Sequence, residues 1–487
     1  MKTDIFNYIL KKSKNSNDIF LINNKKTYAD FYKQTKILKK FINKKVKKRD
    51  VICICLNYSL SFVSLIFAAY LNENIITFIN PNASKKEKLH VIKNTSANLI
   101  FFEKNLIKLN RKKNSLFDLK YIYFNSKINT ELRKQDRFII YTSGTSKKPK
   151  GVIISNKAIS ANVSAIYKDL KLQKKDKSII FSPPAYAMAV SQILTYMTAG
   201  CGIVFYKEGL KFPSELIKKI KIYKISVLNI SVSAFRILKY YLKKGEKFKF
   251  IKIVMSGGMP MTKQIVNLYK KFFPNAKIIN FYGCTENSPR ISHFHVTPRR
   301  KSNQTYFPVG KALEDVKIKI NKLKNSNSKT GLIFISGTSL MSGYFKNKKL
   351  NNKLLINGWY NTGDLGFFDK NKNLHITGRE DNTFSVGHEK LSPEEVESVI
   401  QKKFTLSEIV ITKIKNSILD WLPFGIAVKG KKTKITSDTI QKGLKDYLSN
   451  YKIPKKIIFV KKIPKTTYGK IDRKKSEFIA KKFNEKR

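Results

Sequence analysis

Short apolar runs alternate with longer amphipathic stretches along the first three-quarters of the chain. The runs VICICL at 51–56 and IITFI at 75–79 have the length and composition of strands that are buried on both faces. Residues 59–71 form an apolar stretch with the length of a helix, and 85–94 has the pattern of a second helix. Strands that alternate with helices predict an α/β fold with layered helices and parallel sheets. Further strands are expected at 98–103, 138–141, 178–181, 202–206, 226–230, 251–255 and 277–281.

The pattern changes after residue 381, where we expect a smaller unit that mixes helices and strands. Ser392, followed by Pro393 and two glutamates, predicts a helix start, because serine caps helices and proline and acids suit the first turn. The chain is therefore expected to hold a large layered α/β domain at 1–380 and a small α+β domain at 381–487. In the second domain, strands are predicted at 408–413, 424–429 and 456–460, with a helix at 437–448.

Length and composition indicate a folded protein with more than one domain. The 487 residues are 42% hydrophobic, which is typical of globular chains. The four cysteines form no CxxC pair or zinc spacing, so a reducing, cytoplasmic compartment is expected. The first residues lack the apolar core of a signal peptide, so secretion is not expected. The most apolar run, 62–71, is shorter than the roughly 20 residues of a membrane span, so we expect a buried helix and no transmembrane segment.

The formal net charge of +64 is unusual and would normally suggest a nucleic acid or an anionic membrane as partner. Nearly all of the excess is lysine, and it is spread along the whole chain together with abundant Asn, Ile, Phe and Tyr. This pattern is typical of a coding bias toward AT-rich codons. A binding patch would more often use clustered arginine, so we expect no specific nucleic-acid partner.

The richest chemistry lies at 138–152, FIIYTSGTSKKPKGV, where an apolar strand is followed by hydroxyls, glycines and lysines. Ser155 then offers the cap of a helix. Backbone N–H groups, hydroxyls, glycines that allow close approach and ammonium groups together favour a polyphosphate ligand. The spacing is not that of the Walker-type loop. The alternative is a solvated turn, which the charge alone would fit but the ordered combination disfavours. The glycines and lysines are Gly144, Gly151, Lys147, Lys148 and Lys150.

The segment YTSGTSKKPKG resembles the phosphate-binding signature of the adenylate-forming, AMP-binding superfamily, which includes acyl-CoA synthetases, peptide-synthetase adenylation domains and luciferases. Ser146 and Lys147 stand where the usual signature has Thr and Gly, so the hydroxyl is kept and a glycine is lost. The resemblance implies that ATP phosphates contact Thr142, Ser143, Gly144, Thr145, Ser146 and Lys150.

The segment NFYGCTEN at 280–287 resembles the YGxTE motif of the same superfamily. The resemblance implies that Tyr282 stacks on adenine and that Gly283 allows its close approach. It also implies that Thr285 donates its hydroxyl to the α-phosphate. Glu286 would then bind Mg²⁺, since a carboxylate is the hard oxygen ligand that this ion uses beside phosphates.

Two further motifs follow the expected order of the superfamily. SGGMP at 256–260 resembles the segment that lines the purine, which nominates Gly258 and Met259. YNTGDLG at 360–366 resembles the motif whose aspartate holds the ribose hydroxyls, which nominates Asp364. A carboxylate accepts two hydroxyl donors well, although a turn aspartate is the plainer interpretation of that motif alone.

The last two motifs belong to the domain junction and to the end of the chain. TGRED at 377–381, after an expected hairpin at 369–371, implies that Arg379 also reaches the ribose and that Asp381 is a pivot between domains. PKTTYGKIDRK at 464–474 resembles the final motif, whose lysine, here Lys470, enters the cleft.

One histidine, His388, departs from a superfamily motif, and two others, His293 and His295, lie outside the motifs. His388 stands where a second glycine is usual, which makes docking of a thiol acceptor less secure than adenylation. His293 and His295 are spaced as strand neighbours, with no Cys or acid nearby at ligand spacing. We expect both of them to be structural.

The implied reaction joins ATP and a carboxylic acid into an acyl-adenylate and then transfers the acyl group to a thiol. Its catalytic residues would be Lys470, Thr285 and Lys150, with Lys470 between the carboxylate and the α-phosphate. Amino-acid-activating relatives hold the ammonium with an aspartate, but the segment SPPAYAMAVSQ at 182–192 has none, so an uncharged acyl or aryl acid is favoured.

Coenzyme A is the expected acceptor, with a separate acyl carrier protein as the alternative, because no carrier segment follows Lys470. Two interpretations from other classes remain open at this point. The chain could be a nucleic-acid or membrane-surface binding protein built on this fold, or an inactive adenylation-like binding protein.

Overall fold

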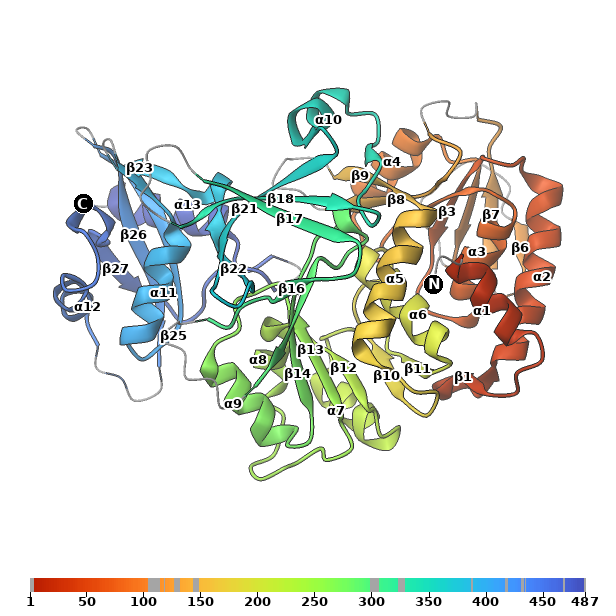
Figure 1. Cartoon of the computed structure of the whole chain (residues 1–487), viewed down its shortest axis with the longest axis horizontal. Coiled ribbons are helices and arrows are strands. Elements are labelled where there is room, and N and C mark those ends of the chain that lie inside the picture. Colours follow the sequence, from red (N-terminus) through yellow and green to blue (C-terminus); the bar gives the residue numbers. More distant parts are fainter. Residues whose placement is uncertain are drawn as a thin grey trace.

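The computed structural model describes residues 4–103, 114–117, 119–126, 132–142, 149–297, 306–322, 329–386, 389–416, 419–430, 433, 435–466 and 469–485. A large N-terminal unit holds an eight-stranded, a nine-stranded and a five-stranded sheet. A smaller C-terminal unit lies beside it, at the left of Figure 1. The predicted fold class, a large α/β unit with a small C-terminal one, is confirmed. The boundary at 381 stays a prediction.

The eight-stranded sheet has the order β19-β9-β8-β4-β3-β5-β7-β6. Its four central strands are parallel, as their apolar runs predicted. The region 104–136, for which the apolar pattern predicts no strand, holds β6 and β7, and β7 is buried through Leu119 and Tyr121 on one face and Ile122 on the other. The strands are β3 (Val51–Cys55), β4 (Ile75–Phe78), β5 (Leu99–Phe102), β6 (Asn114–Leu116), β7 (Leu119–Tyr123), β8 (Asp136–Thr142), β9 (Lys150–Ser155) and β19 (Gly343–Tyr344).

The nine-stranded sheet has the order β16-β15-β14-β13-β12-β10-β11-β1-β2. All pairs from β1 to β14 along this path are parallel, and the strands predicted between 178 and 281 are confirmed. The carboxyl ends of β10, β12, β13 and β14 therefore meet at one edge, where ligands collect in sheets of this kind. The strands are β1 (Ile19–Leu21), β2 (Lys26–Thr27), β10 (Lys177–Ile180), β11 (Gly202–Phe205), β12 (Val227–Asn229), β13 (Ile253–Gly257), β14 (Lys277–Tyr282), β15 (Ser292–Val296) and β16 (Lys311–Ala312).

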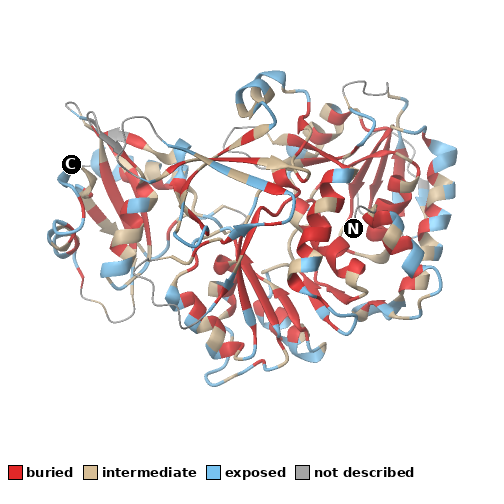
Figure 2. Ribbon diagram, in the orientation of Figure 1, coloured by how far each residue is buried: buried red, intermediate tan, exposed pale blue. Residues whose placement is uncertain are grey.

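Helices α5 (Asn156–Leu170) and α6 (Ala187–Ala199) lie between these two sheets (Figure 1). One apolar core joins them to both sheets, and α6 is buried along most of its length. Figure 2 shows this burial running through the strands and the helices between them. The predicted cap of α5 is confirmed, since the Ser155 side chain accepts a hydrogen bond from the Ala158 N–H.

The remaining helices of the large unit cover the sheets. The predicted helices at 59–71 and 85–94 are confirmed as α3 and α4. A second core packs α7, α8 and α9 on the other face of the nine-stranded sheet. The bounds are α1 (Ile5–Ser13), α2 (Tyr28–Lys45), α3 (Leu60–Leu71), α4 (Lys85–Thr95), α7 (Pro213–Ile222), α8 (Val232–Leu238), α9 (Lys263–Phe272) and α10 (Lys348–Leu354).

The five-stranded sheet leads into the C-terminal unit. It has the order β17-β18-β21-β20, with β22 beside β21, and the predicted hairpin at 369–371 joins β21 to β22. These strands are β17 (Val316–Lys322), β18 (Gly331–Gly337), β20 (Leu355–Ile356), β21 (Trp359–Phe368) and β22 (Leu374–Arg379).

The C-terminal unit packs three helices on a three-stranded sheet, β25-β26-β27. Its predicted helix start is confirmed, although the Ser392 hydroxyl donates to Glu394 Oε2 at 3.2 Å and does not cap the backbone. The predicted strands and the helix at 437 are also present. The elements are β23 (Phe384–Val386), β24 (Glu389–Leu391), α11 (Pro393–Lys403), β25 (Leu406–Asn416), β26 (Asp420–Lys429), α12 (Ser437–Leu444), β27 (Lys456–Phe459) and α13 (Arg473–Glu485).

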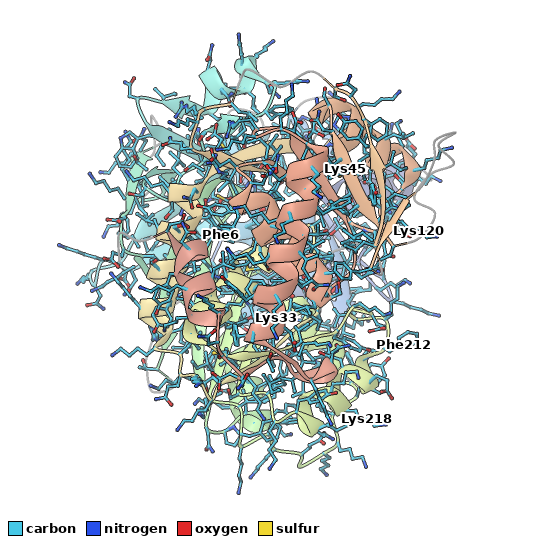
Figure 3. The ribbon with its side chains drawn as sticks, turned by 90° about the vertical axis from the view of Figure 1, so that its right-hand side faces the viewer. Phe6, Lys33, Lys45, Lys120, Phe212 and Lys218 are labelled. Atoms are coloured by element: carbon cyan, nitrogen blue, oxygen red, sulfur yellow. The ribbon has the colours of Figure 1, made fainter. Side chains whose placement is uncertain are left out.

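Lysine side chains point outward from many separate elements. Figure 3 shows Lys33 and Lys45 on α2, Lys120 on β7 and Lys218 on α7, all of them exposed, while Phe6 lies inside. This dispersal fits a compositional bias better than one binding patch. Within the described ranges, the structure has no helix with the length and apolar character needed to cross a membrane.

Replacing Phe138 by alanine should lower the free energy of unfolding by about 3–5 kcal/mol, because the cavity would lie in the main core. The Phe138 ring is fully buried, with its centroid 5.9 Å from that of Phe6 and 6.4 Å from that of Phe78. Urea unfolding measures the change. Tyr240→Ala is the control, because Tyr240 is 73% exposed and should cost no more than about 0.5 kcal/mol. Equal losses for the two variants would contradict the assigned core.

Candidate active site

The ends of β13 and β14 lie side by side at the cleft edge, with Gly257 paired to Phe281. Gly258 follows β13 with φ +77°, a conformation that favours glycine. Gly283 follows β14, and a Cβ there would come within 1.9 Å of the Pro289 carbonyl oxygen. Only glycine fits this turn without moving the backbone. The half-buried Met259 packs against the core beneath α8 and α9.

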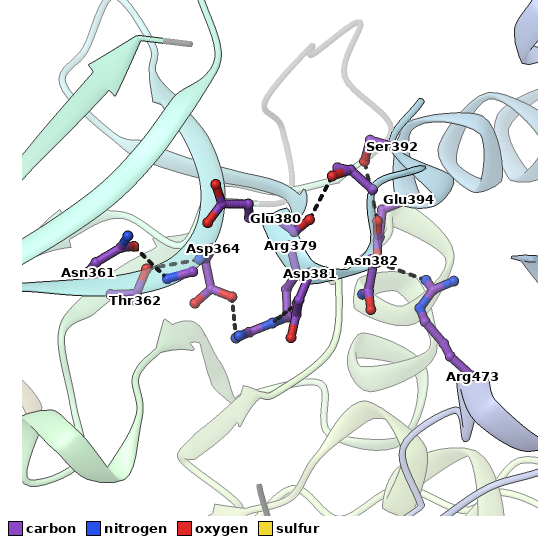
Figure 4. Close-up of polar contacts among 12 residues, drawn as sticks. Asn361, Thr362, Asp364, Arg379, Glu380, Asp381, Asn382, Ser392, Glu394 and Arg473 are labelled. Carbon is purple, nitrogen blue, oxygen red and sulfur yellow. Dashed lines mark hydrogen bonds and ion pairs between the residues drawn. The ribbon is translucent and has the colours of Figure 1, made fainter. Parts of the chain in front are cut away.

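A hydrogen-bonded chain starts at Tyr282, the last residue of β14. Its hydroxyl donates to Asp364 Oδ2, while Asp364 Oδ1 accepts from Arg379 Nη1 at 2.9 Å. Arg379 Nε also donates to Asp381 Oδ1 at 2.9 Å, which brings the chain to the domain junction (Figure 4). Burial raises the pKa of Asp364, while the Arg379 guanidinium and the Tyr282 hydroxyl act in the opposite direction. The structure therefore brings together three residues that the motifs nominated separately.

The turn after Gly283 is a short 3₁₀ helix, η2 (Thr285–Asn287), that presents Thr285 and Glu286 half-buried. Glu286 Oε1 accepts a hydrogen bond from the Tyr344 hydroxyl at 2.7 Å. Lys150 Nζ lies 5.8 Å from the centroid of the Tyr344 ring. One tyrosine thus lies beside both the nominated metal ligand and the nominated phosphate-binding lysine. Motif reasoning missed Tyr344 because it belongs to none of the signatures.

The loop expected to hold phosphates leaves β8 at Thr142 and re-enters the sheet at Lys150, which pair across the ladder. Residues 143–148, including Ser143, Gly144, Thr145, Ser146, Lys147 and Lys148, lie outside the described part of the chain. The prediction that the loop runs directly into a helix is wrong. The apolar run VIIS at 152–155 forms the rest of β9, antiparallel to β8, before α5 begins.

Lys470 lies on a hairpin that touches the large unit. The Thr466 N–H donates to the Lys470 carbonyl at 2.8 Å, and the Gly469 N–H donates to the Thr466 carbonyl at 2.9 Å. A Cβ on Gly469 would lie 3.3 Å from Ser233 Oγ, at the start of α8. The charge of Lys470 is close enough to lower the pKa of Asp364. The hairpin of the terminal lysine therefore lies beside α8, and its charge acts on the aspartate of the ribose motif.

One further contact between the two units is polar, and two polar contacts lie inside the C-terminal unit close to the junction. Arg236 on α8 lies 3.6 Å from Glu408 on β25, and both side chains are partly exposed. Asn382 Nδ2 donates to Glu394 at 2.6 Å, close to the point where the chain enters the C-terminal unit (Figure 4). Arg473, three residues after Lys470, donates to Glu394 at 2.9 Å from the C-terminal side of the junction. No extensive apolar contact accompanies these pairs in the described residues.

His293 and His295 have an acidic partner that the sequence did not reveal. Asp169 at the end of α5 contacts His293 Nδ1 at 2.7 Å and His295 Nε2 at 3.0 Å. Sequence spacing could not reveal this partner, because the fold brings Asp169 to His293 across 124 residues of sequence. Among the described residues, no group of three or more His, Cys, Asp or Glu side chains is arranged to hold a metal ion. Gly387 and His388 lie outside the described part of the chain.

Comparison with known proteins shows similarity to coenzyme A ligases. The 2-succinylbenzoate–CoA ligase of Listeria monocytogenes is 28% identical over 340 residues, covering 69% of this chain and 68% of its own. The 4-coumarate–CoA ligase 2 of Nicotiana tabacum is 25% identical over 483 residues, covering 92% and 88%.

Solved structures share the fold. The O-succinylbenzoate coenzyme A synthetase of Bacillus subtilis in complex with AMP superposes with a TM-score of 0.77, at 20% identity and with 96% and 97% of the two chains covered. The amide bond synthetase McbA from Marinactinospora thermotolerans reaches 0.84, at 17% identity and with 98% and 100% covered. The model of the AMP-binding enzyme family matches residues 11–345, and the chain therefore belongs to that family.

Proposed function

We propose that this enzyme uses ATP to activate a carboxylic acid and then transfers the acyl group to coenzyme A. In the first step a carboxylate oxygen attacks the α-phosphorus and pyrophosphate leaves. In the second step a thiolate attacks the acyl carbonyl carbon and AMP leaves with the bonding electron pair. The observation that carries the proposal is the position of Lys470, whose hairpin touches Ser233 and whose charge acts on Asp364.

The nucleotide would lie along the edge where β13 and β14 end. Tyr282 offers an aromatic face to adenine beside Gly258 and Met259, and Asp364 offers carboxylate oxygens to the ribose hydroxyls. An ionised carboxylate accepts about four hydrogen bonds, so Asp364 keeps acceptor capacity beyond Tyr282 and Arg379. Arg379 would add a donor on the ribose side.

The phosphate end has both a cation and a carboxylate. Lys150 would contact the leaving phosphates together with Thr142, and Thr285 would donate to the α-phosphate. The half-buried Glu286 carboxylate fits the hard-oxygen donor set of Mg²⁺, because only its Oε1 atom is held by Tyr344. A magnesium ion bound there would neutralise charge on the phosphates, which are themselves ligands of this ion.

Lys470 would reduce the main obstacle to the first step, which is the weak and electrostatically repelled nucleophile. A carboxylate is a weak nucleophile, and the negative triphosphate repels it. An ammonium between the carboxylate and the α-phosphate offsets this repulsion and stabilises the charge that develops in the transition state. Removing one preorganised group of this kind typically costs about 10²–10³ in rate.

The acceptor and the compartment follow from different observations. The named relatives are coenzyme A ligases, which favours coenzyme A over a separate carrier protein. The four cysteines are free thiols, which favours a reducing, cytoplasmic compartment.

The test is ATP–pyrophosphate exchange over a panel of aliphatic, aromatic and dicarboxylic acids, followed by thioester formation with coenzyme A. We expect exchange that requires Mg²⁺ and one class of acid. Binding of nucleic acid or anionic vesicles that needs no ATP, falls steeply with salt and comes without exchange would favour the binding-protein alternatives instead.

Lys470→Ala should lower the rate of adenylate formation by about 10²–10³-fold. It should leave thioester formation from a supplied acyl-adenylate nearly unchanged, because the phosphoryl step is already complete. The two half-reactions are measured separately by pyrophosphate exchange and by coenzyme A consumption. Lys462→Ala, an exposed lysine of the same unit, is the control and should change neither rate. Equal loss of both half-reactions would assign Lys470 another role.

Asp381→Pro should block thioester formation and spare pyrophosphate exchange, if the C-terminal unit rotates at this residue between the two steps. Proline fixes φ and restricts the preceding residue, so a backbone change at the junction would be prevented. The variant also loses the contact with Arg379, so Asp381→Ala is the matched control and should keep both half-reactions. Normal thioester formation by the proline variant would place the pivot elsewhere.

A further inference from the structure

Arg290 is a charged side chain inside the large unit. It is 2% exposed and is the largest of the fully buried side chains in the described residues. Its guanidinium carbon lies 3.3 Å from the centroid of the Phe281 ring on β14. Asn162 on α5 holds its backbone, accepting from the Arg290 N–H at 3.2 Å and donating to its carbonyl at 2.7 Å. The side chain therefore has a fixed place between α5 and the nine-stranded sheet.

The Arg290 guanidinium lacks the partners that buried charges usually have. Neither Nε nor Nη1 has a hydrogen-bond partner, and no carboxylate of the described residues acts on its charge. Burial lowers the pKa of Arg290 to about 9. An uncompensated buried cation costs several kcal/mol, and such unsatisfied groups in native proteins call for an explanation. The stacking on Phe281 offsets only about 2 kcal/mol of that cost.

The backbone at Arg290 packs against the turn that carries Tyr282 and Gly283. A Cβ on Gly283 would come within 3.0 Å of the Arg290 Cα, and the Ile291 N–H donates to the Tyr282 carbonyl at 2.9 Å. The carboxylate that reacts must stay near Thr285 and Lys470, at the edge where β13 and β14 end. The remainder of the acid would then extend inward, on the side of the sheet where α5 and α6 pack.

A second nitrogen without a partner faces the same side. His293 pairs with Phe281 across the β14–β15 ladder, and Asp169 binds its Nδ1 at 2.7 Å. Its buried Nε2 has no hydrogen-bond partner. Burial and, to a smaller extent, the charge of Arg290 lower the pKa of His293, while Asp169 acts in the opposite direction. The guanidinium of Arg290 and the ring of His293 thus both carry buried nitrogens without a hydrogen-bond partner.

We propose that Arg290 is a specificity-determining residue that binds a second carboxylate at the far end of the acyl substrate. This inference rests on the proposed function and identifies the substrate class as dicarboxylic acids. The absence of a carboxylate at 182–192 had favoured an uncharged acid, but it excludes only an ammonium group. A single guanidinium matches a monoanion in charge, and its fork of donors matches carboxylate geometry.

The test compares a dicarboxylic acid with its monoamide, which has the same length but no second charge. We expect the wild type to prefer the diacid in kcat/KM of pyrophosphate exchange by about 10²–10³-fold, the factor that corresponds to losing one partner of a buried charge pair. Arg290→Met should lose that preference, so that its kcat/KM values for the diacid and the monoamide agree within about threefold. Arg290→Lys should keep part of the preference.

Thermal unfolding separates binding from a structural role. If the charge of Arg290 is unpaired until an anion binds, Arg290→Met should unfold at the same or a higher temperature than the wild type. The diacid should then stabilise only the wild type. Arg133→Met, an exposed residue, is the control and should leave the diacid preference intact. A lower unfolding temperature with equal loss on both acids would overturn the proposal. A wild type that prefers monocarboxylic acids would also overturn it and leave the proposed function standing, whereas exchange with no acid at all would overturn both.

Discussion

The hydrogen-bonded chain from Tyr282 through Asp364 to Arg379 fixes the geometry on which the rest of the cleft depends. It joins the end of the nine-stranded sheet to the five-stranded sheet and, through Asp381, to the C-terminal unit. An isolated carboxylate at this depth would cost several kcal/mol, so Asp364 needs both of its partners to remain charged. This chain of contacts therefore links two sheets of the large unit to the first residues of the C-terminal unit.

Stability is distributed unevenly around that chain. Inside the large unit, α5 and α6 bury apolar surface against two sheets at once, which makes this part rigid. At the junction the contacts are partly exposed ion pairs, such as Arg236 with Glu408, and pairs of this kind contribute about 1 kcal/mol or less. The large unit is therefore held together mainly by apolar packing, whereas the contact of Arg236 with Glu408 between the units is polar.

Sequence patterns predicted what local information controls. Uninterrupted apolar runs gave most strands, and glycine positions such as Gly283 marked the turn where the backbone leaves no room for a side chain. The hairpin of β6 and β7 and the strand β9 were missed, because lysines interrupt the first and the second directly follows the expected loop. Asp169 beside His293, Tyr344 beside Glu286 and the position of Lys470 depend on contacts between distant segments, and no local pattern encodes them.

The large net charge acts differently at the surface and in the cleft. Most lysines are solvated, and salt screens them over about 8 Å, so they form a diffuse field that attracts anions without selecting among them. Selection requires charges that water cannot reach. Lys470 and Arg379 act on Asp364, whereas Arg290 is buried with no acid from the described part of the chain beside it. In a chain with so many positive charges, the cation that says most about the substrate is therefore Arg290, because no anionic partner for it is found among the described residues.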